Sequence, residues 1–267
     1  MEKKKYIYDM SEKNRLILIT NDDGYNSYGI QVLKRINTLF SNNIWVFAPK
    51  HNQSAKAHSI TINRDIDLIK LNNKNYVIEG TPADCVIIGL EKIKSDKKYC
   101  NLLISGINEG VNLGYDLIYS GTVAAAREGC LNGVQSIAMS IDTSNGRIEW
   151  SGLEYFAPKI IQTIIDTNIY KSFFFNINFP SQSKDQIKGI KVVKLGHRKP
   201  GSMIISNNNN YQIPSERKII KEAKPGEDEY ELRNGFVTIT IHNGSNLMLN
   251  EHDFLKLQTI LENTLEK

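Results

Sequence analysis

The chain has 267 residues, of which 40% are hydrophobic and 23% charged, and its mean hydropathy is -0.35. This length and composition predict a folded protein with a sizeable core, and they exclude a disordered chain, a small disulfide scaffold and a membrane-bound protein. With 33 basic and 29 acidic residues the net charge is +4, which is too small to indicate a nucleic acid or a membrane as partner.

Residues 1–13 are polar and carry a basic start without a continuous apolar run, so we expect a flexible tail rather than a signal peptide. The three cysteines, Cys85, Cys100 and Cys130, are odd in number and show no Cys-x-x-Cys spacing. This pattern indicates neither a disulfide framework nor a thiolate zinc site, and it favours a cytoplasmic protein.

Strands and helices alternate in the first part of the chain. The continuously apolar run LILIT over residues 16–20 predicts a strand that is buried on both faces of a parallel sheet. A helical spacing of apolar residues over 29–40 and a second apolar strand over 44–48 complete a βαβ unit. Residues 65–70 and 76–79 flank an asparagine-rich turn and predict an inserted hairpin.

The same alternation continues to about residue 180. Thr81 followed by Pro82 and, two residues later, by Asp84 predicts a capped helix start, with the helix ending near residue 90. The later elements are a strand over 101–105, a loop over 106–121, a helix over 123–132, a strand over 136–140, a helix over 153–166 and a strand over 173–179.

Beyond Pro180 the pattern changes. Short strands over 190–195 and 235–241 flank a polar segment rich in Asn and Pro, which predicts an extended arm or hairpin. Asn250 is expected to cap a terminal helix. The fold class is therefore α/β, a doubly wound and mostly parallel sheet over residues 14–180, followed over 181–267 by a β-rich arm and a helix that we assign to oligomerisation.

Two carboxylates follow the first predicted strand. Ligands of open parallel sheets bind outside the carboxyl ends of the strands, where Asp22 and Asp23 lie. Adjacent carboxylates repel unless a cation lies between them, and such oxygen ligands suit magnesium, calcium or manganese. The alternative is that Asn-Asp-Asp-Gly is an ordinary surface turn.

A second group of polar residues lies in the loop before the helix at 123–132. Ser120, Gly121 and Thr122 directly precede that helix, and a helix start with glycine and hydroxyl residues is a suitable anion site. Asn108 and Asn112 add neutral hydrogen-bonding groups. A plain threonine N-cap after a glycine turn is the alternative.

Several signatures of other enzyme classes are absent from the sequence. It has no P-loop, no Gly-x-Gly-x-x-Gly after the first strand, no His-Glu-x-x-His and no Gly-x-Ser-x-Gly. These absences disfavour a P-loop kinase, a dinucleotide-dependent enzyme, a zinc protease and a serine hydrolase. The features that still indicate a function are the paired carboxylates and a helix start that suits phosphate.

Four motifs in this order, LILITNDDG, VFAPKHNQSAKAHSITI, GTPADCV and LLISGINEGVNLGYDLIYSGTVAAAREG, resemble the SurE family of metal-dependent 5'(3')-nucleotidases. The likeness continues more weakly through FNINFP, KLGHR and PGEDEYELRNGFVTIT, so it covers nearly the whole chain from Leu16. Two departures are Lys50, where the family commonly has aspartate, and Ala55, where glycine is frequent.

The resemblance implies a Rossmann-like core, with one divalent cation per subunit, Mg²⁺ or Mn²⁺. It also implies a homodimer or homotetramer in which C-terminal arms are exchanged. Carried over residue by residue, the cation ligands fall on Asp22, Asp23, Ser54 and Asn108, and the phosphate contacts on Asn112, Ser120, Gly121 and Thr122.

The expected activity is hydrolysis of nucleoside 5'- and 3'-monophosphates to nucleoside and phosphate. Asp22 or Asp23 is the candidate general base, and His58 is either the leaving-group acid or a structural hydrogen-bond partner. Lys50 and Lys56 add positive charge that would suit short polyphosphate, unless they are ordinary solvated loop lysines.

Two other classes of function stay open. One is a regulatory module that binds a nucleotide or phosphate without chemistry. The other is a phosphatase that forms an aspartyl-phosphate on Asp22, although such enzymes normally have an Asp-x-Asp spacing rather than adjacent acids.

Overall fold

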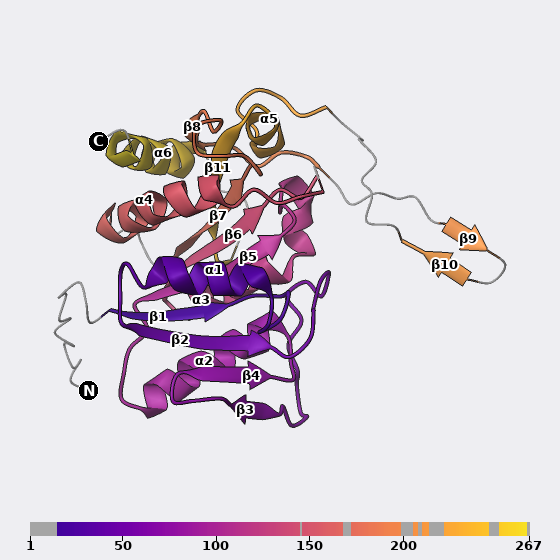
Figure 1. Ribbon diagram of the computed structural model, residues 1–267, viewed down its shortest axis with the longest axis vertical. Coiled ribbons are helices and arrows are strands. Elements are labelled where there is room, and N and C mark those ends of the chain that lie inside the picture. Colours follow the sequence, from indigo (N-terminus) through magenta and orange to yellow (C-terminus); the bar gives the residue numbers. More distant parts are fainter. Residues whose placement is uncertain are drawn as a thin grey trace.

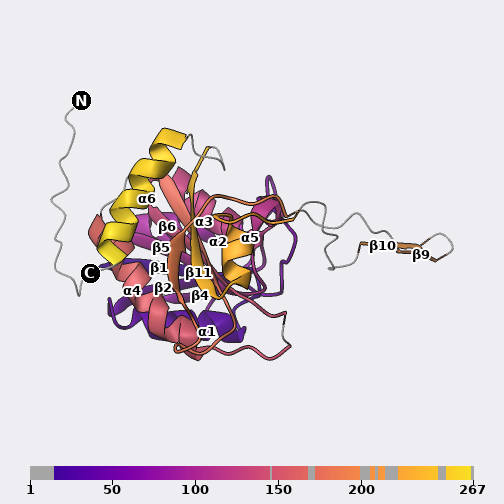
Figure 2. The same cartoon turned by 90° about the horizontal axis from the view of Figure 1, so that it is seen from above.

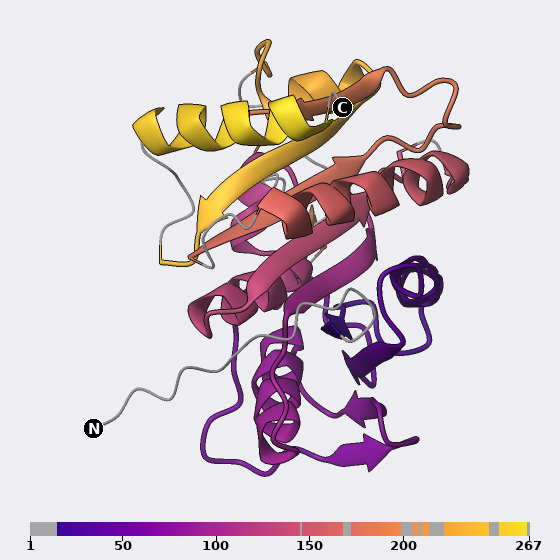
Figure 3. The same ribbon diagram turned by 90° about the vertical axis from the view of Figure 1, so that its left-hand side faces the viewer.

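The computed structural model describes residues 15–144, 146–167, 172–198, 205–207, 210–213, 222–245 and 251–265. A nine-stranded sheet lies between two layers of helices (Figures 1 and 3). Its strands are β1 (Leu16–Thr20), β2 (Asn43–Pro49), β3 (Leu68–Lys70), β4 (Asn75–Ile78), β5 (Leu102–Glu109), β6 (Gln135–Ile141), β7 (Phe173–Phe179), β8 (Gly189–Val192) and β11 (Phe236–Asn243). The helices are α1 (Tyr28–Asn37), α2 (Pro82–Ser95), the 3-10 helix η2 (Gly114–Ile118), α3 (Gly121–Leu131), α4 (Ser151–Thr167), α5 (Asp228–Arg233) and α6 (Glu251–Leu265).

The strand order is β3-β4-β2-β1-β5-β6-β7-β11-β8. From β4 to β7 neighbouring strands are parallel, β3 is antiparallel to β4, and β11 is antiparallel to β7. The chain builds outward from β1 in both directions, first through β2 and β4 and then through β5, β6 and β7. The predicted α/β class is confirmed, and the junction of β1 and β5 is the switch point at which such sheets bind ligands.

The apolar side chains of β1 pack on both faces of the sheet. Ile17 and Ile19 pack in the cluster that includes residues of α1, α4 and α6, whereas Leu16 and Leu18 pack in the cluster that includes residues of α2. Side chains alternate between the two faces of a strand, so only a strand covered on both faces is apolar at every position.

Local capping signals define the helix starts. Thr81 and Asp84 form a reciprocal capping box at α2, and Pro82 occupies its first turn, as the sequence predicts. Ser27 caps α1. The predicted end of α2 near residue 90 is wrong, because the helix continues to Ser95.

The loop expected from residue 106 begins later than the sequence indicates. β5 continues to Glu109, and its register with β6 shifts between Ser105 and Asn108. Gly106 has a φ of +140°, and a Cβ atom there would lie 2.4 Å from the Met139 carbonyl oxygen. Glycine is therefore required at this irregularity, which lets the strand carry Asn108 past the point where its apolar pattern ends.

Two strands expected in the C-terminal arm belong to the central sheet. β11 pairs with β7, and β8 pairs with β11, so the sheet extends well beyond residue 180. Only β9 (Ile205–Asn207) and β10 (Asn210–Gln212) form a separate two-stranded sheet, which stands away from the body of the protein (Figures 1 and 2). The hairpin of β3 and β4 and the terminal helix α6 are confirmed, whereas the expected N-terminal tail and the Asn250 cap lie outside the described residues.

No helix in the described part of the chain combines the length and apolarity that a membrane crossing requires. The three cysteines are buried.

Candidate active site

The carboxyl ends of β1, β2 and β5 and the first turn of α3 come together at the switch point. Asp22 lies at their centre and is 4% exposed. Its carboxylate accepts a hydrogen bond from the Thr122 hydroxyl, and its carbonyl oxygen accepts one from the Gln53 N–H at 2.7 Å. This one residue therefore joins β1 to α3 and to the loop that follows β2.

Asp23 makes the corresponding connection to β5. Its Oδ2 accepts the Glu109 N–H at 3.2 Å, and its Oδ1 accepts the Asn52 side-chain amide at 3.3 Å. Asp23 is half-buried, so its carboxylate lies closer to solvent than that of Asp22. The sequence missed Asn52 and Glu109, although each lies within two residues of a predicted ligand.

Burial and mutual repulsion disfavour the charged forms of these acids. Burial, followed by the charge of Asp23, raises the pKa of Asp22 to about 6. Burial also raises the pKa of Asp23, and burial together with the Asp23 charge raises the pKa of Glu109. The site thus concentrates negative charge where water solvates it poorly.

A divalent cation fits this acid pair. In the described chain no Lys, Arg or His forms an ion pair with Asp22 or Asp23. The described residues contain no group of three or more His, Cys, Asp and Glu placed to hold a metal. A cation here would therefore complete its shell with neutral oxygen atoms, which is a donor set suited to hard cations.

Asn108 and Ser54 are the neutral candidates. The Asn108 Nδ2 donates to the Gly110 carbonyl at 2.5 Å, which fixes the nitrogen end of the amide and leaves its oxygen to accept. Ser54 is exposed, and its N–H donates to the Asn52 Oδ1 at 2.8 Å. Among the hydrogen bonds of the described residues none joins the Ser54 hydroxyl to either aspartate, so Asn52 is what ties this loop to Asp23.

The start of α3, predicted as the phosphate site, already receives a carboxylate. The Thr122 hydroxyl and backbone N–H both face Asp22 and lower its pKa against the larger effect of burial. Gly121 lies against the same side chain, and a Cβ atom there would be 2.8 Å from the Asp22 Cβ. Ser120 caps the helix, because its Oγ accepts the Val123 N–H at 3.1 Å.

Asn112 is held by the sheet. Its Nδ2 donates to the Ser140 hydroxyl at 2.8 Å, and its N–H donates to the Asn178 Oδ1 at 2.8 Å. Its carbonyl oxygen accepts the side-chain amides of Asn176 and Asn178. These partners lie on β6 and β7, far along the chain, and no local sequence pattern identifies them.

His58 and Lys50 have partners away from the acid pair. The His58 Nε2 lies 2.8 Å from the Glu128 Oε2 on α3, and this hydrogen bond lowers the pKa of Glu128. The Lys50 ammonium lies 2.8 Å from the Glu79 carboxylate. Lys56 is exposed.

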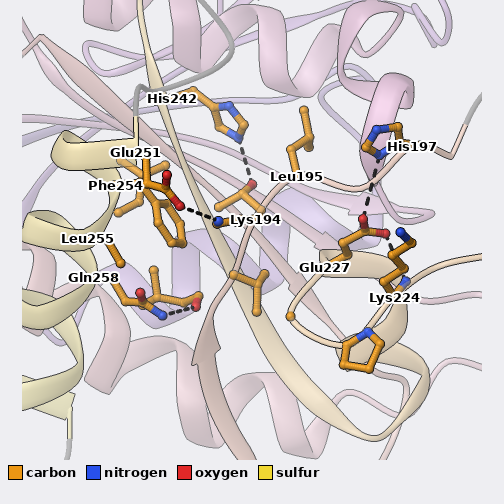
Figure 4. Close-up of a pocket in the computed structure, with 16 residues that line it drawn as sticks. Lys194, Leu195, His197, Lys224, Glu227, His242, Glu251, Phe254, Leu255 and Gln258 are labelled. Atoms are coloured by element: carbon orange, nitrogen blue, oxygen red, sulfur yellow. Dashed lines mark hydrogen bonds and ion pairs between the residues drawn. The ribbon is translucent and has the colours of Figure 1, made fainter.

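The described chain also has a hollow of about 680 Å³ between β8, β11, α6 and the segment that precedes α5 (Figure 4). Polar side chains in it pair with one another, as in the ion pair of Lys194 with Glu251 at 3.2 Å and the hydrogen bond of His242 with Thr240 at 2.8 Å. None of the predicted site residues lines it, so the size of this hollow does not mark the catalytic centre.

Comparisons with known proteins agree with the sequence motifs. The family model described as "Survival protein SurE" matches residues 17–202. A "5'-nucleotidase SurE" of Paramagnetospirillum magneticum is 37% identical over 229 residues, which cover 84% of this chain and 88% of that protein. Another "5'-nucleotidase SurE", of a Chelativorans species, is 33% identical over 232 residues, with 84% and 91% covered. The crystal structure of a SurE protein from Aquifex aeolicus superposes with a TM-score of 0.76 at 32% identity, covering 92% of this chain and 99% of that one.

Proposed function

This chain belongs to the SurE family, and from that membership we propose that it hydrolyses nucleoside 5'- and 3'-monophosphates with the help of one divalent cation per subunit. It is an enzyme of the 5'-nucleotidase class for which its relatives are named. The observation that carries the metal-dependent part is the acid pair at the switch point, in which Asp22 is buried and Asp23 half-buried and which has no basic partner among the described residues.

Asp22, Asp23, Asn108 and Ser54 would hold the cation, with Mg²⁺ or Mn²⁺ suited to these oxygen atoms. When bound, the cation neutralises charge on the phosphoryl group and acidifies water. Thr122 fixes the Asp22 carboxylate, so Asp22 acts as a positioned ligand. Asp23 lies closer to solvent and is the better placed of the two to accept a proton from an attacking water.

The first turn of α3 would bind the phosphate beside Asp22. Gly121 keeps the backbone close to the acid pair, and the positive end of the helix dipole favours an anion. Ser120 and Asn112 are the further phosphate contacts we propose, although in the structure the Ser120 hydroxyl caps α3 and the Asn112 amide bonds Ser140. His58 remains the proposed leaving-group acid, and its contact with Glu128 fits an imidazole that is held in one orientation.

An apolar rim beside α3 suits a nucleoside better than a bare phosphate chain. Tyr119 and Ile118 precede the helix start and are 44% and 52% exposed, and Ile60 on the loop after β2 is 46% exposed. The Ala57 N–H donates to the Tyr119 carbonyl at 3.0 Å, so these two segments lie together. Short polyphosphate is a further substrate to test, but Lys50 is engaged by Glu79 and so offers it little support.

We also propose a homodimer or homotetramer with exchanged arms, located in the cytoplasm. The β9–β10 hairpin supports exchange, since it stands away from the body and carries the highly exposed Tyr211 and Ile213 (Figure 2). The odd number of cysteines and the absence of a Cys-x-x-Cys spacing suit a reducing compartment.

The decisive experiment is a phosphatase panel of 5'- and 3'-nucleoside monophosphates, polyphosphate and a simple aryl phosphate, each with Mg²⁺, Mn²⁺ or EDTA. We expect nucleotide hydrolysis that EDTA abolishes. Binding without turnover would identify a regulatory module, and a trapped phosphoenzyme that forms without metal would identify the aspartyl-phosphate mechanism.

A further inference from the structure

The η2 turn, which leads into α3, is held by residues far along the chain. η2 ends two residues before Ser120, and its Asp116 carbonyl oxygen accepts the Ser120 N–H at 3.1 Å. The position of Ser120, and with it the first turn of α3, therefore depends on where Asp116 lies.

The Asp116 side chain forms an ion pair with Arg198. Asp116 is 5% exposed, and its Oδ2 lies 3.0 Å from the Arg198 Nε. The guanidinium also lies 3.9 Å from Glu229 on α5. Because both partners are largely withdrawn from water, this ion pair is screened much less than a surface pair.

Hydrogen bonds also hold the backbone beside Asp116 against Arg198 and Asp228. The Tyr115 N–H donates to the Arg198 carbonyl at 2.6 Å, and the Gly114 N–H donates to the Asp228 Oδ2 at 2.9 Å. Gly114 has a φ of +53°, and a Cβ atom there would lie 2.5 Å from the Arg198 backbone nitrogen. The η2 segment and the segment around Arg198 therefore leave no room for a methyl group at Gly114, and this close packing defines the position of η2.

We propose that Asp116 and Arg198 are positioning residues, which place the η2 turn so that Ser120 and the first turn of α3 can bind the phosphate of the substrate. Neither side chain is assigned to the phosphate itself. The inference rests on the proposed phosphate site at α3. It adds that this site requires an ion pair between two residues that lie more than 80 positions apart in the sequence.

Two single variants test this role. Asp116→Asn keeps the size of the side chain and removes its charge, and Arg198→Gln removes the guanidinium. We expect both to raise KM for a nucleoside monophosphate, and the inhibition constant of inorganic phosphate, by about tenfold with a smaller change in kcat. The double variant should be no worse than Arg198→Gln alone, because that variant already lacks the ion pair with Asp116.

Arg233→Gln is the matched control. Arg233 belongs to the same network, with its guanidinium 2.7 Å from Glu229, but it forms its ion pair within α5 rather than with η2. We expect its KM and phosphate inhibition to match those of the unaltered protein. Thermal denaturation of all variants shows whether each is folded.

Folded Asp116→Asn and Arg198→Gln variants with unchanged KM and phosphate inhibition would overturn the positioning role. If a single variant does not fold, the double variant, which leaves no unpaired buried charge, gives the same readout. If the unaltered protein neither hydrolyses nucleotides nor is inhibited by phosphate, the proposed function fails instead.

Discussion

Replacing Gly121 with alanine tests whether the close contact of α3 with Asp22 is needed for catalysis. The new Cβ would lie 2.8 Å from the Asp22 Cβ and 3.0 Å from the Pro82 Cγ. Carbon atoms pack best about 3.5 Å or more apart, so the start of α3 and Asp22 must separate by about 0.7 Å.

The effect on stability should be modest. Overpacking costs about 1–3 kcal/mol, whereas alanine in place of glycine within a helix contributes about 1 kcal/mol. The net loss of about 0–2 kcal/mol would lower Tm by no more than about 8 °C in a chain of this size. The displacement matters more for catalysis, because a misplacement of about 1 Å can cost about a hundredfold, and we expect kcat/KM to fall at least about tenfold.

Steady-state kinetics with a nucleoside monophosphate and thermal denaturation measure the two effects. Gly133→Ala is the control, since Gly133 lies just beyond α3 with a φ of +73°, and a Cβ atom there would meet no atom within 4 Å. It should lower stability through backbone strain and leave kcat/KM unchanged. A folded Gly121→Ala variant with native kcat/KM would refute the reasoning.

Four further outcomes are expected. Asp22→Asn or Asp23→Asn should lower kcat at least about a hundredfold, near 3 kcal/mol of barrier, with the fold retained by circular dichroism; near-native activity would remove the acids from the mechanism. EDTA should abolish activity and added Mg²⁺ or Mn²⁺ should restore it, whereas full activity after dialysis against EDTA contradicts a metal site. Replacing the β9–β10 hairpin with a short Gly-Ser linker should reduce the proposed oligomer to smaller species in light scattering, and an unchanged mass would exclude arm exchange. Burial raises the pKa of Asp228 from 3.8 to about 6, so the folded state binds this proton more tightly than the unfolded chain. Its contribution to the free energy of unfolding is therefore full below about pH 4 and falls by about 3 kcal/mol as the pH rises through about 6, which urea titrations of the protein and of Asp228→Asn would show as a pH-dependent difference.

The sequence predicts those parts of the site that depend on local patterns. An uninterrupted apolar strand followed by Asp22 and Asp23 places two carboxylates at a strand end, and strand alternation then places that end at the switch point. The capping box of Thr81 and Asp84 is equally local, because its residues lie three apart. Each of these predictions needs only neighbours within one or two turns of chain.

The parts that the sequence did not predict depend on contacts between distant segments. β5 runs past Ser105 because Gly106 fits against Met139 on the next strand. The spacing of apolar residues in β5 does not indicate this contact. β11 joins β7 by pairing between residues that lie 60 to 70 positions apart in the sequence. Asn112 suits a phosphate by residue type, yet its amide bonds Ser140, because hydrogen-bond partners are chosen by the tertiary fold.

The ion pair of Asp116 with Arg198 illustrates why such distant contacts matter for function. A buried ion pair adds little net stability, since desolvation offsets most of the attraction, so its value lies in fixing geometry. Arg198 is the last described residue before the β9–β10 hairpin, and Asp228, which holds the same turn through Gly114, follows the hairpin in the sequence. Residues on both sides of the hairpin in the sequence therefore hold the turn that precedes α3. An exchange of hairpins between subunits would act on residues that hold the turn before the proposed phosphate site, so assembly and substrate binding would depend on one set of contacts.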